Sequence, residues 1–258
     1  MKHFGIIGKP LVQSFSANYF NQKFRAEHID AEYSLYPLAN IEAFTALIAD
    51  ARKRFADDGG LFAGMNVTIP YKTAIIPYLT TLDETAATIG AVNVIQFMPD
   101  GRTCGYNTDA PGFIDAIRPH LKKTDRHALI LGTGGAAKAC RYGLNKLGIS
   151  TIMASRTPQE GQVSYDHLRL GDYQVIVNCT PLGMFPETAF CPPIPYEQLT
   201  AEQFLFDCIY NPEETLFLRH GREKGCRTQN GIEMLLGQAR AAERIWSGVE
   251  IKGKKNKE

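Results

Sequence analysis

A glycine-rich turn in the middle of the chain constrains the fold more than any other feature of the sequence. The run Ala128–Leu131 is short and apolar, as is typical of a buried strand in a parallel sheet. Gly132, Gly134 and Gly135 follow at once, and apolar residues then recur at the spacing of one helix face. Because glycine lets the backbone approach a pyrophosphate and a helix N-terminus offers unpaired N–H groups, the pattern predicts a dinucleotide-binding turn. An ordinary structural turn is the alternative.

The segment after this turn indicates which dinucleotide would bind. Residues 150–155 read as the next strand, at the distance that a strand–helix–strand unit requires. An NAD site, like a methyl-donor fold, would usually carry an acidic residue at the end of that strand, whereas this chain has Ser155, Arg156 and Thr157. An arginine suits a 2′-phosphate, to which its guanidinium offers a fork of charged donors. The sequence therefore favours NADP, and a solvated strand-end arginine is the alternative.

Two further apolar segments, residues 173–178 and 204–209, read as strands of the same sheet. Each is followed by a polar loop, Cys179–Met184 after the first segment and Tyr210–Pro212 after the second. Open α/β sheets hold ligands beyond the carboxyl ends of their strands, so both loops are candidates for contact with a ligand. Gly231 then opens the last strong helical pattern.

The N-terminal part of the chain contains a predicted strand with one polar face. Asn66 and Thr68 alternate with apolar residues along this strand. A polar face on a core strand needs partners, which are either protein groups or a polyhydroxylated ligand. Lys72 follows shortly after Pro70, near the start of a helix predicted to run toward Leu79.

Other polar positions near the predicted strands are candidates for binding. Ser14 and Ser16 face the same way if their segment is extended, and Ser16 is predicted to cap the helix that follows it. Asn93 is a polar residue within a largely apolar stretch, residues 90–97. Asp109 is a candidate for contact with a ligand, but capping of the next helix explains it equally well on local grounds.

Composition and charge exclude several classes of protein. The formal net charge is +1, which gives no sign of a nucleic-acid partner or another polyanion. Neither a signal-peptide core nor an apolar run of membrane-spanning length is present, so no membrane partner and a cytoplasmic location are expected. The six cysteines include no C-x-x-C pair, and the six histidines do not cluster at metal spacing. Buried thiols and no metal are therefore expected.

Several segments, taken together and in order along the chain, resemble the shikimate dehydrogenase family. The similar motifs are Gly8-Lys9-Pro10 with Ser14 and Ser16, then Asn66–Lys72, Gly90–Asn93, Asn107–Asp109, Gly132–Ala137, Ser155–Thr157, Asn178–Met184, Tyr210–Pro212 and Asn230–Gln238. The resemblance covers nearly the whole chain, and the agreement of separate motifs makes it more specific than any one of them.

The resemblance implies which residues form the site. Lys72 and Asp109 would be the catalytic pair, since reduction of a carbonyl needs a proton supplied to its oxygen. The substrate-binding residues implied are Ser14, Ser16, Asn66, Thr68, Lys72, Asn93, Asp109, Tyr210 and Gln238. The cofactor-binding residues implied are Gly132, Thr133, Gly134, Gly135, Ala136, Ser155, Arg156, Thr157, Thr180 and Gly231. The set includes no metal ligand.

The resemblance also implies an architecture and an activity. Two α/β domains would surround a cleft, and the second would contain a Rossmann-type doubly wound parallel sheet. Residues 1–108, completed by C-terminal helices within 231–258, would form the substrate-binding catalytic domain, and residues 109–230 the NADP-binding domain. The implied reaction is the reversible NADPH-dependent reduction of 3-dehydroshikimate to shikimate in aromatic amino-acid biosynthesis, by a monomer or homodimer.

Two other functions remain open from the sequence. A quinate/shikimate dehydrogenase of broader substrate range or with NAD use would share these motifs. The feature that favours it is Pro158-Gln159-Glu160, where many family members carry a second basic residue. A regulator that binds NADP without turnover is the remote alternative, and it would be expected to lose Lys72 or Asp109, which are both present.

Overall fold

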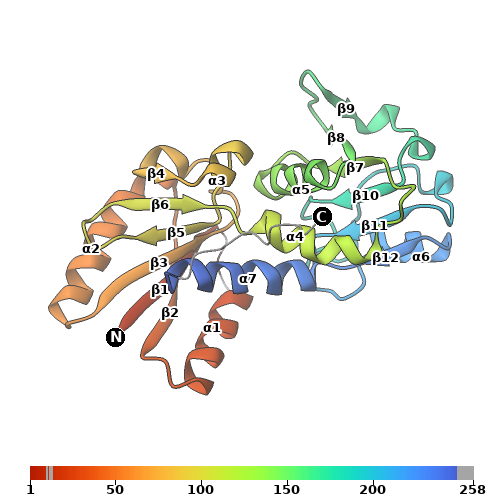
Figure 1. The fold of residues 1–258 in the computed structure, drawn as a ribbon. Coiled ribbons are helices and arrows are strands. Elements are labelled where there is room, and N and C mark those ends of the chain that lie inside the picture. Colours follow the sequence, from red (N-terminus) through yellow and green to blue (C-terminus); the bar gives the residue numbers. More distant parts are fainter. Residues whose placement is uncertain (10, 12–13, 249–258) are drawn as a thin grey trace, which may run out of the picture. The chain divides into compact units, whose positions relative to one another are not determined.

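Two six-stranded sheets, each with its own helices, make up the structure (Figure 1). This computed structural model describes residues 1–9, 11 and 14–248. One compact unit, here called the first unit, contains Met1–Thr108 and the chain from Ala239 onward, and the second unit contains Asp109–Gln238. The helix α7 (Ile232–Trp246) therefore contributes its first part to the second unit and its remainder to the first.

The sheet of the first unit is mixed. Its strands are β1 (Lys2–Gly8), β2 (Ala31–Pro37), β3 (Leu61–Val67), β4 (Thr81–Leu82), β5 (Val94–Phe97) and β6 (Thr103–Tyr106). They lie in the order β2-β1-β3-β5-β6-β4. The strands β1, β2 and β3 are parallel, whereas β5 runs antiparallel to both β3 and β6.

Helices cover both faces of this first sheet, because consecutive strand residues point to opposite sides. On β1, Ile7 belongs to the core beneath α2 (Phe44–Asp57), whereas Ile6 packs with residues of α1 (Phe15–Ala26) and of α7. The short helix α3 (Glu84–Ile89) begins at Asp83, whose carboxylate accepts hydrogen bonds from the N–H groups of its first turn.

The sheet of the second unit is entirely parallel. Its strands are β7 (His127–Leu131), β8 (Ser150–Ser155), β9 (Gln162–Ser164), β10 (Val175–Asn178), β11 (Phe204–Asp207) and β12 (Arg227–Gln229). Their order is β12-β11-β10-β7-β8-β9. This is the strand order of a Rossmann-type doubly wound sheet. The direction in which successive strands are added reverses between β7 and β10.

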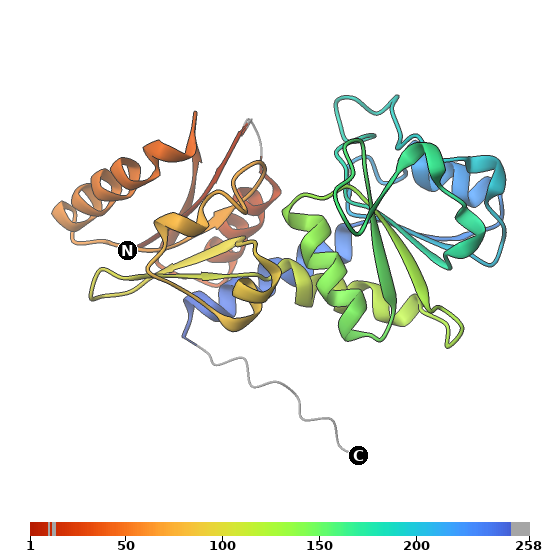
Figure 2. The ribbon, with the colours of Figure 1, turned by 90° about the horizontal axis from the view of Figure 1, so that it is seen from above.

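The second sheet is likewise covered on both faces. Ile130 and Val177 pack beneath α4 (Asp109–Ile117) and α5 (Gly135–Lys146), whereas Leu129 and Ile176 point to the face that carries α6 (Leu216–Glu223). Figure 2 shows α5 and α6 on opposite sides of these strands. Burial on both faces explains why the central strands β7, β10 and β11 read as continuous apolar runs.

Two local predictions in the first unit are wrong. Ser16 does not cap the first helix, because α1 already begins at Phe15, with Ser14 in the capping position. The segment from Lys72 to Leu79 forms turns and a short 3-10 helix, Ile76–Tyr78, in place of the predicted helix. Pro77 lies inside that segment, where it removes a backbone donor that a continuous helix would need.

The predicted α/β class, with two sheets of which one is a parallel Rossmann-type sheet, is confirmed. The glycine turn follows β7 directly, and the predicted strand at residues 150–155 is β8. Within the described ranges, no helix combines the length and the apolar character that crossing a membrane would require.

Candidate functional site

The glycine turn lies at the carboxyl end of β7 and at the N-terminus of α5. Gly132 has a φ of 103°, a left-handed backbone conformation that side chains rarely adopt. A Cβ atom added to Gly132 would lie 3.3 Å from a methyl carbon of Thr180, so the turn also packs closely on the loop after β10. A Cβ atom added to Gly134, the N-cap of α5, would have none of the described heavy atoms within 4 Å.

These features fit a dinucleotide. The backbone next to α5 is open on one side, and the first N–H groups of a helix attract a pyrophosphate. Thr133, Gly135 and Ala136 complete the turn, and the reversal of strand order between β7 and β10 is the position at which such sheets bind nucleotides. The residues present would therefore hold NADP at this edge.

The predicted 2′-phosphate residues lie at the end of the neighbouring strand. Ser155 is the last residue of β8, and its hydroxyl accepts a hydrogen bond of 3.2 Å from the backbone N–H of Thr157. This bond shapes the turn that carries Arg156 between them. The Arg156 side chain is exposed, as a guanidinium that receives a phosphate from solvent must be.

A buried polar network fixes the loops after β10 and β11. The side-chain oxygen of Asn178 accepts two hydrogen bonds from Thr180, one from the Thr180 backbone N–H (2.9 Å) and one from the Thr180 hydroxyl (2.7 Å). The Asn178 amide in turn donates to Asp207 at 3.0 Å. The second carboxylate oxygen of Asp207 receives the Thr215 hydroxyl at 2.6 Å, and its first also receives the N–H of Ile209. The side chain of Asn178, itself held by Asp207, thus fixes the position of the candidate cofactor residue Thr180.

Burial raises the pKa of Asp207 to about 7, because loss of hydration disfavours the carboxylate more than its hydrogen bonds from Thr215, Ile209 and Asn178 stabilise it. The sequence reasoning missed Asp207 and Thr215. The signal that was available is that β10 and β11, otherwise apolar, each end in a buried polar residue.

Gly231, Tyr210 and Gln238 also lie in the second unit. A Cβ atom on Gly231 would clash with the carbonyl oxygen of Cys208, so only glycine fits between β11 and the start of α7. Tyr210 follows β11 and is 36% exposed, and Gln238 is buried on α7. Asp109, the first residue of α4, is buried as well, where its charge interacts favourably with the helix N-terminus.

In the first unit, Tyr33 contacts the predicted substrate residue Asn66. Its hydroxyl donates a hydrogen bond of 2.6 Å to Oδ1 of Asn66 on β3. Burial raises the pKa of Tyr33 well above its usual range, and a hydrogen bond with Ser16 partly opposes that rise. Sequence reasoning did not single out Tyr33, which looked like one aromatic position of an alternating strand.

A second hydrogen-bonded chain continues from Asn66 to the neighbouring predicted residue. The amide of Asn66 donates to the carbonyl oxygen of Asn93 at 3.1 Å. The Asn93 amide donates to the Thr108 hydroxyl at 2.9 Å, and its oxygen accepts the backbone N–H of Thr108 at 2.7 Å and the Thr108 hydroxyl at 3.2 Å. Protein groups therefore supply hydrogen-bond partners for Asn66 on the polar face predicted for this strand.

Thr68 and Lys72 lie just beyond the carboxyl end of β3. The backbone N–H of Thr68 donates to Ile7 on β1 at 2.9 Å, and the carbonyl oxygen of Lys72 accepts from Val92, which precedes β5, at 2.7 Å. Ser14 precedes α1 and makes no capping hydrogen bond with the described backbone. Pro10, from the N-terminal motif, lies outside the described residues.

Known proteins are similar to this chain over most of its length. The family model described as "Shikimate dehydrogenase substrate binding domain" matches residues 6–95. "Shikimate dehydrogenase (NADP(+))" of Carboxydothermus hydrogenoformans is 39% identical over 264 residues, which covers 95% of this chain and 91% of that protein.

The chain belongs to the shikimate dehydrogenase family.

Solved structures of similar proteins agree with this membership. Shikimate 5-dehydrogenase of Thermus thermophilus, in complex with NADP(H) and shikimate, is 30% identical with a TM-score of 0.83, over 96% of this chain and 94% of that one. Quinate dehydrogenase of Corynebacterium glutamicum, in complex with NAD, is 26% identical with a TM-score of 0.81, over 97% of this chain and 95% of that one. The predicted resemblance to the shikimate dehydrogenase family is confirmed.

This family member is expected to lose stability as pH rises through the window set by Asp207. Between the usual pKa of 3.8 and the folded value of about 7, the folded state binds a proton that the unfolded state does not. The free energy of unfolding therefore falls as pH rises across this window, by up to about 1.4 kcal/mol per pH unit. Asp207→Asn, which is neutral at every pH, should lack this contribution. Denaturant unfolding from about pH 4 to about pH 8 measures both slopes.

Asp115→Asn on the exposed side of α4 is the matched control, and it should keep the wild-type slope. If Asp207→Asn unfolds with the same pH dependence as wild type and the control, then the carboxyl group of Asp207 does not titrate in this window.

Proposed function

We propose that this chain is an NADP-dependent shikimate dehydrogenase, which reduces 3-dehydroshikimate reversibly to shikimate in aromatic amino-acid biosynthesis. The observation that carries the proposal is the match to the NADP(+)-dependent relative over 95% of the chain. Arg156 at the end of β8, where an acidic residue would favour NAD, supports the same cofactor. The presence of both Lys72 and Asp109 argues against a regulator without turnover.

The protein's part in this reaction is placement and proton transfer. NADP, when bound at the turn after β7, supplies the hydride chemistry. Lys72 and Asp109 are the proposed proton-transfer residues, since one proton leaves the hydroxyl oxygen on oxidation and returns on reduction. Neither needs a metal ion as partner for this role.

Shikimate carries a carboxylate and three ring hydroxyls, and different residue types suit the two kinds of group. We assign Ser14, Ser16 and Tyr210 to the carboxylate, because hydroxyl groups donate well to a charged acceptor. Amide and hydroxyl side chains suit the ring hydroxyls, and this second set is Asn66, Thr68, Asn93 and Gln238. The hydrogen bond from Tyr33 supports the assignment of Asn66, since it holds that amide in a fixed position.

The domain roles follow from these assignments. We propose that residues 1–108, completed by the C-terminal helix, bind the substrate, and that residues 109–230 bind NADP. The family model for the substrate-binding domain, which matches residues 6–95, supports the first role. The parallel sheet with its glycine turn supports the second.

Location and assembly belong to the proposal as well. We expect a cytoplasmic enzyme with a small-molecule substrate and no nucleic-acid or membrane partner, because the net charge is only +1. The six cysteines, all in the described part of the chain, form no disulfide, as is usual in a reducing compartment. A monomer and a homodimer are both compatible with the sheet edges.

A quinate/shikimate dehydrogenase is the second candidate. The similar quinate dehydrogenase bound to NAD supports it, as does the lack of a basic residue at Pro158, Gln159 and Glu160 after Arg156. Quinate keeps the carboxylate and the three ring hydroxyls of shikimate and adds a fourth, so the same residues would contact it.

Purified protein is expected to oxidise shikimate with NADP faster than it oxidises quinate at equal concentration. The reason is that the set of Ser, Asn and Thr side chains of the family's shikimate motifs is intact. Absorbance of the reduced cofactor measures the rates of both substrates with both NADP and NAD. A quinate rate equal to the shikimate rate, or a higher one, would move the assignment to the second candidate.

A further inference from the structure

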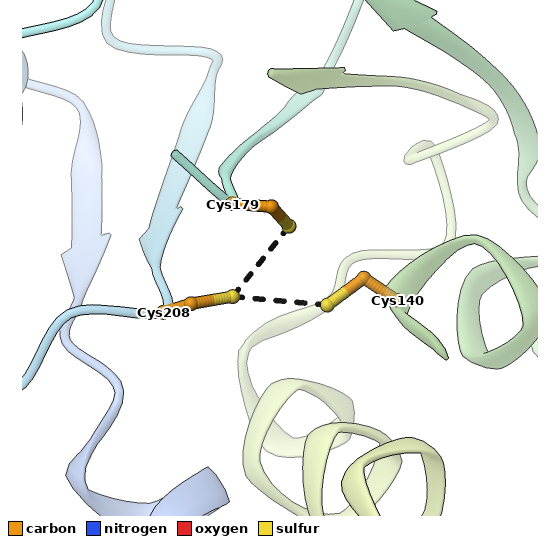
Figure 3. A group of neighbouring side chains, drawn as sticks. All are labelled: Cys140, Cys179 and Cys208. Atoms are coloured by element: carbon orange, nitrogen blue, oxygen red, sulfur yellow. Dashed lines mark hydrogen bonds between the residues drawn. The ribbon is translucent and has the colours of Figure 1, made fainter. Parts of the chain in front are cut away.

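Three cysteine side chains from separate elements of the second unit converge at one point (Figure 3). Cys140 lies on α5, Cys179 directly follows β10, and Cys208 directly follows β11. The Sγ atom of Cys208 is 3.6 Å from that of Cys179 and 3.8 Å from that of Cys140. All three sulfur atoms lie within 4.8 Å of one another, and no disulfide joins any of them.

The backbone fixes this convergence. Asn178 pairs with Asp207 in the parallel ladder, so Cys179 and Cys208 occupy the next pair of positions on neighbouring strands. The N–H of Cys208 donates to the carbonyl oxygen of Asn178 at 2.9 Å, which holds the two positions together. Cys140 comes from α5 and is fully buried, whereas Cys179 and Cys208 are partly buried.

We propose that Cys140, Cys179 and Cys208 together bind a divalent thiophilic cation, with zinc as the ion of best fit. Zinc–sulfur bonds of about 2.3 Å place two thiolates of a tetrahedral site about 3.8 Å apart. The separations of 3.6 Å and 3.8 Å match this spacing before any ion is bound. Each thiol that binds releases its proton to solvent, and a water molecule fills the fourth position.

The three-fold convergence distinguishes this site from a pair of thiols poised for oxidation. A disulfide needs two sulfur atoms about 2.05 Å apart and engages only two residues. Here Cys208 lies about equally far from both neighbours, as a shared ligand set requires. The sequence led us to expect no metal, because these cysteines are far apart along the chain and no C-x-x-C pair is present. The proposal does not depend on the proposed function.

Titration of the reduced, full-length protein with cadmium under argon tests the proposal, since cadmium thiolates absorb in the ultraviolet. We expect one tightly bound cadmium per chain, and a lower apparent cadmium affinity in excess zinc, because zinc competes for the same thiolates. Cys179→Ala should weaken binding by at least about 10- to 100-fold, the loss that removal of even an outer-shell partner causes. The matched control replaces the three other cysteines, Cys104, Cys191 and Cys226, with alanine and should bind as wild type does.

Several results would overturn the proposal. They are the lack of a bound equivalent in the wild type or the control variant, equal affinity in Cys179→Ala, and an apparent cadmium affinity that excess zinc leaves unchanged. If Cys179→Ala does not fold, crystals of the wild-type protein soaked in cadmium decide by anomalous scattering. A peak between the three Sγ atoms supports the site, and peaks at other residues alone refute it.

Discussion

Lys72→Ala is expected to lower kcat for shikimate oxidation by about 10²–10⁴-fold, the usual contribution of a positioned proton-transfer group. KM for shikimate should change far less, because the proposed hydroxyl and amide residues would still hold the ring. The backbone carbonyl of Lys72 accepts a hydrogen bond from Val92 that does not involve the side chain, so truncation of the side chain should leave the fold intact. Steady-state kinetics, with a thermal melt to confirm folding, measure both effects.

A lysine without a catalytic role provides the comparison. Lys53 is exposed on α2, and Lys53→Ala should leave kcat and Tm unchanged, as surface substitutions usually do. A folded Lys72→Ala protein whose kcat stays within a few-fold of the control would rule out the catalytic assignment.

Asp109 extends this test from one residue to a pair. A carboxylate that acts with Lys72 favours the charged amine and orients it, so Asp109→Ala should impair both kcat and binding. The double variant should then lose less than the sum of the two single losses, when each loss is expressed as a free energy. Strict additivity would mean that the two side chains act in separate steps.

Arg156→Ala is expected to weaken NADP binding by about 10- to 150-fold and to leave NAD binding nearly unchanged. A charge-assisted hydrogen bond contributes about 1.5–3 kcal/mol, and each 1.4 kcal/mol corresponds to about tenfold in affinity. The exposed guanidinium at the end of β8 is the group that would make this contact with the 2′-phosphate, which NAD lacks. Dissociation constants for both cofactors, measured by fluorescence of the reduced forms, give the comparison.

Arg126 supplies the matched control for this variant. It is exposed and directly precedes β7, at the end of the sheet opposite to the glycine turn. Arg126→Ala should therefore leave the affinities for both cofactors unchanged. Equal losses of NADP and NAD affinity in Arg156→Ala would show that the arginine does not read the 2′-phosphate.

The central strands of the second unit could be predicted well from sequence because they are buried on both faces. Such strands read as unbroken apolar runs, and glycine or polar residues end them, so β7 was located almost to the residue, whereas the short, partly buried strands β9 and β12 were not predicted. The first unit was harder to predict. The segment after Lys72 contains enough apolar residues for a helix, but Pro77 breaks it, and periodicity alone does not weigh one proline against its neighbours.

The candidate site was predictable where its residues stand in contiguous motifs. Gly132 and Arg156 could be interpreted from their positions after strands, without knowledge of the tertiary structure. The positioning residues were missed because their partners are distant along the chain. Tyr33 bonds Asn66, and Asp207 bonds Asn178, contacts that only the paired strands create. The cluster of Cys140, Cys179 and Cys208 was missed for the same reason, because the pairing of β10 with β11 brings Cys179 and Cys208 together.

The helix α7 has a consequence for the order in which the chain matures during synthesis. Trp246, near its end, packs against the rings of Phe4 and Phe20 and donates its indole N–H to Ile95. A Cβ atom on Gly64 would clash with that indole ring, so the sheet is shaped to receive the tryptophan. Domains generally fold in order of emergence from the ribosome, N-terminal first. Here the unit that emerges first must wait for residue 246 to bury its aromatic surface, while the continuous second unit has all its strands available earlier.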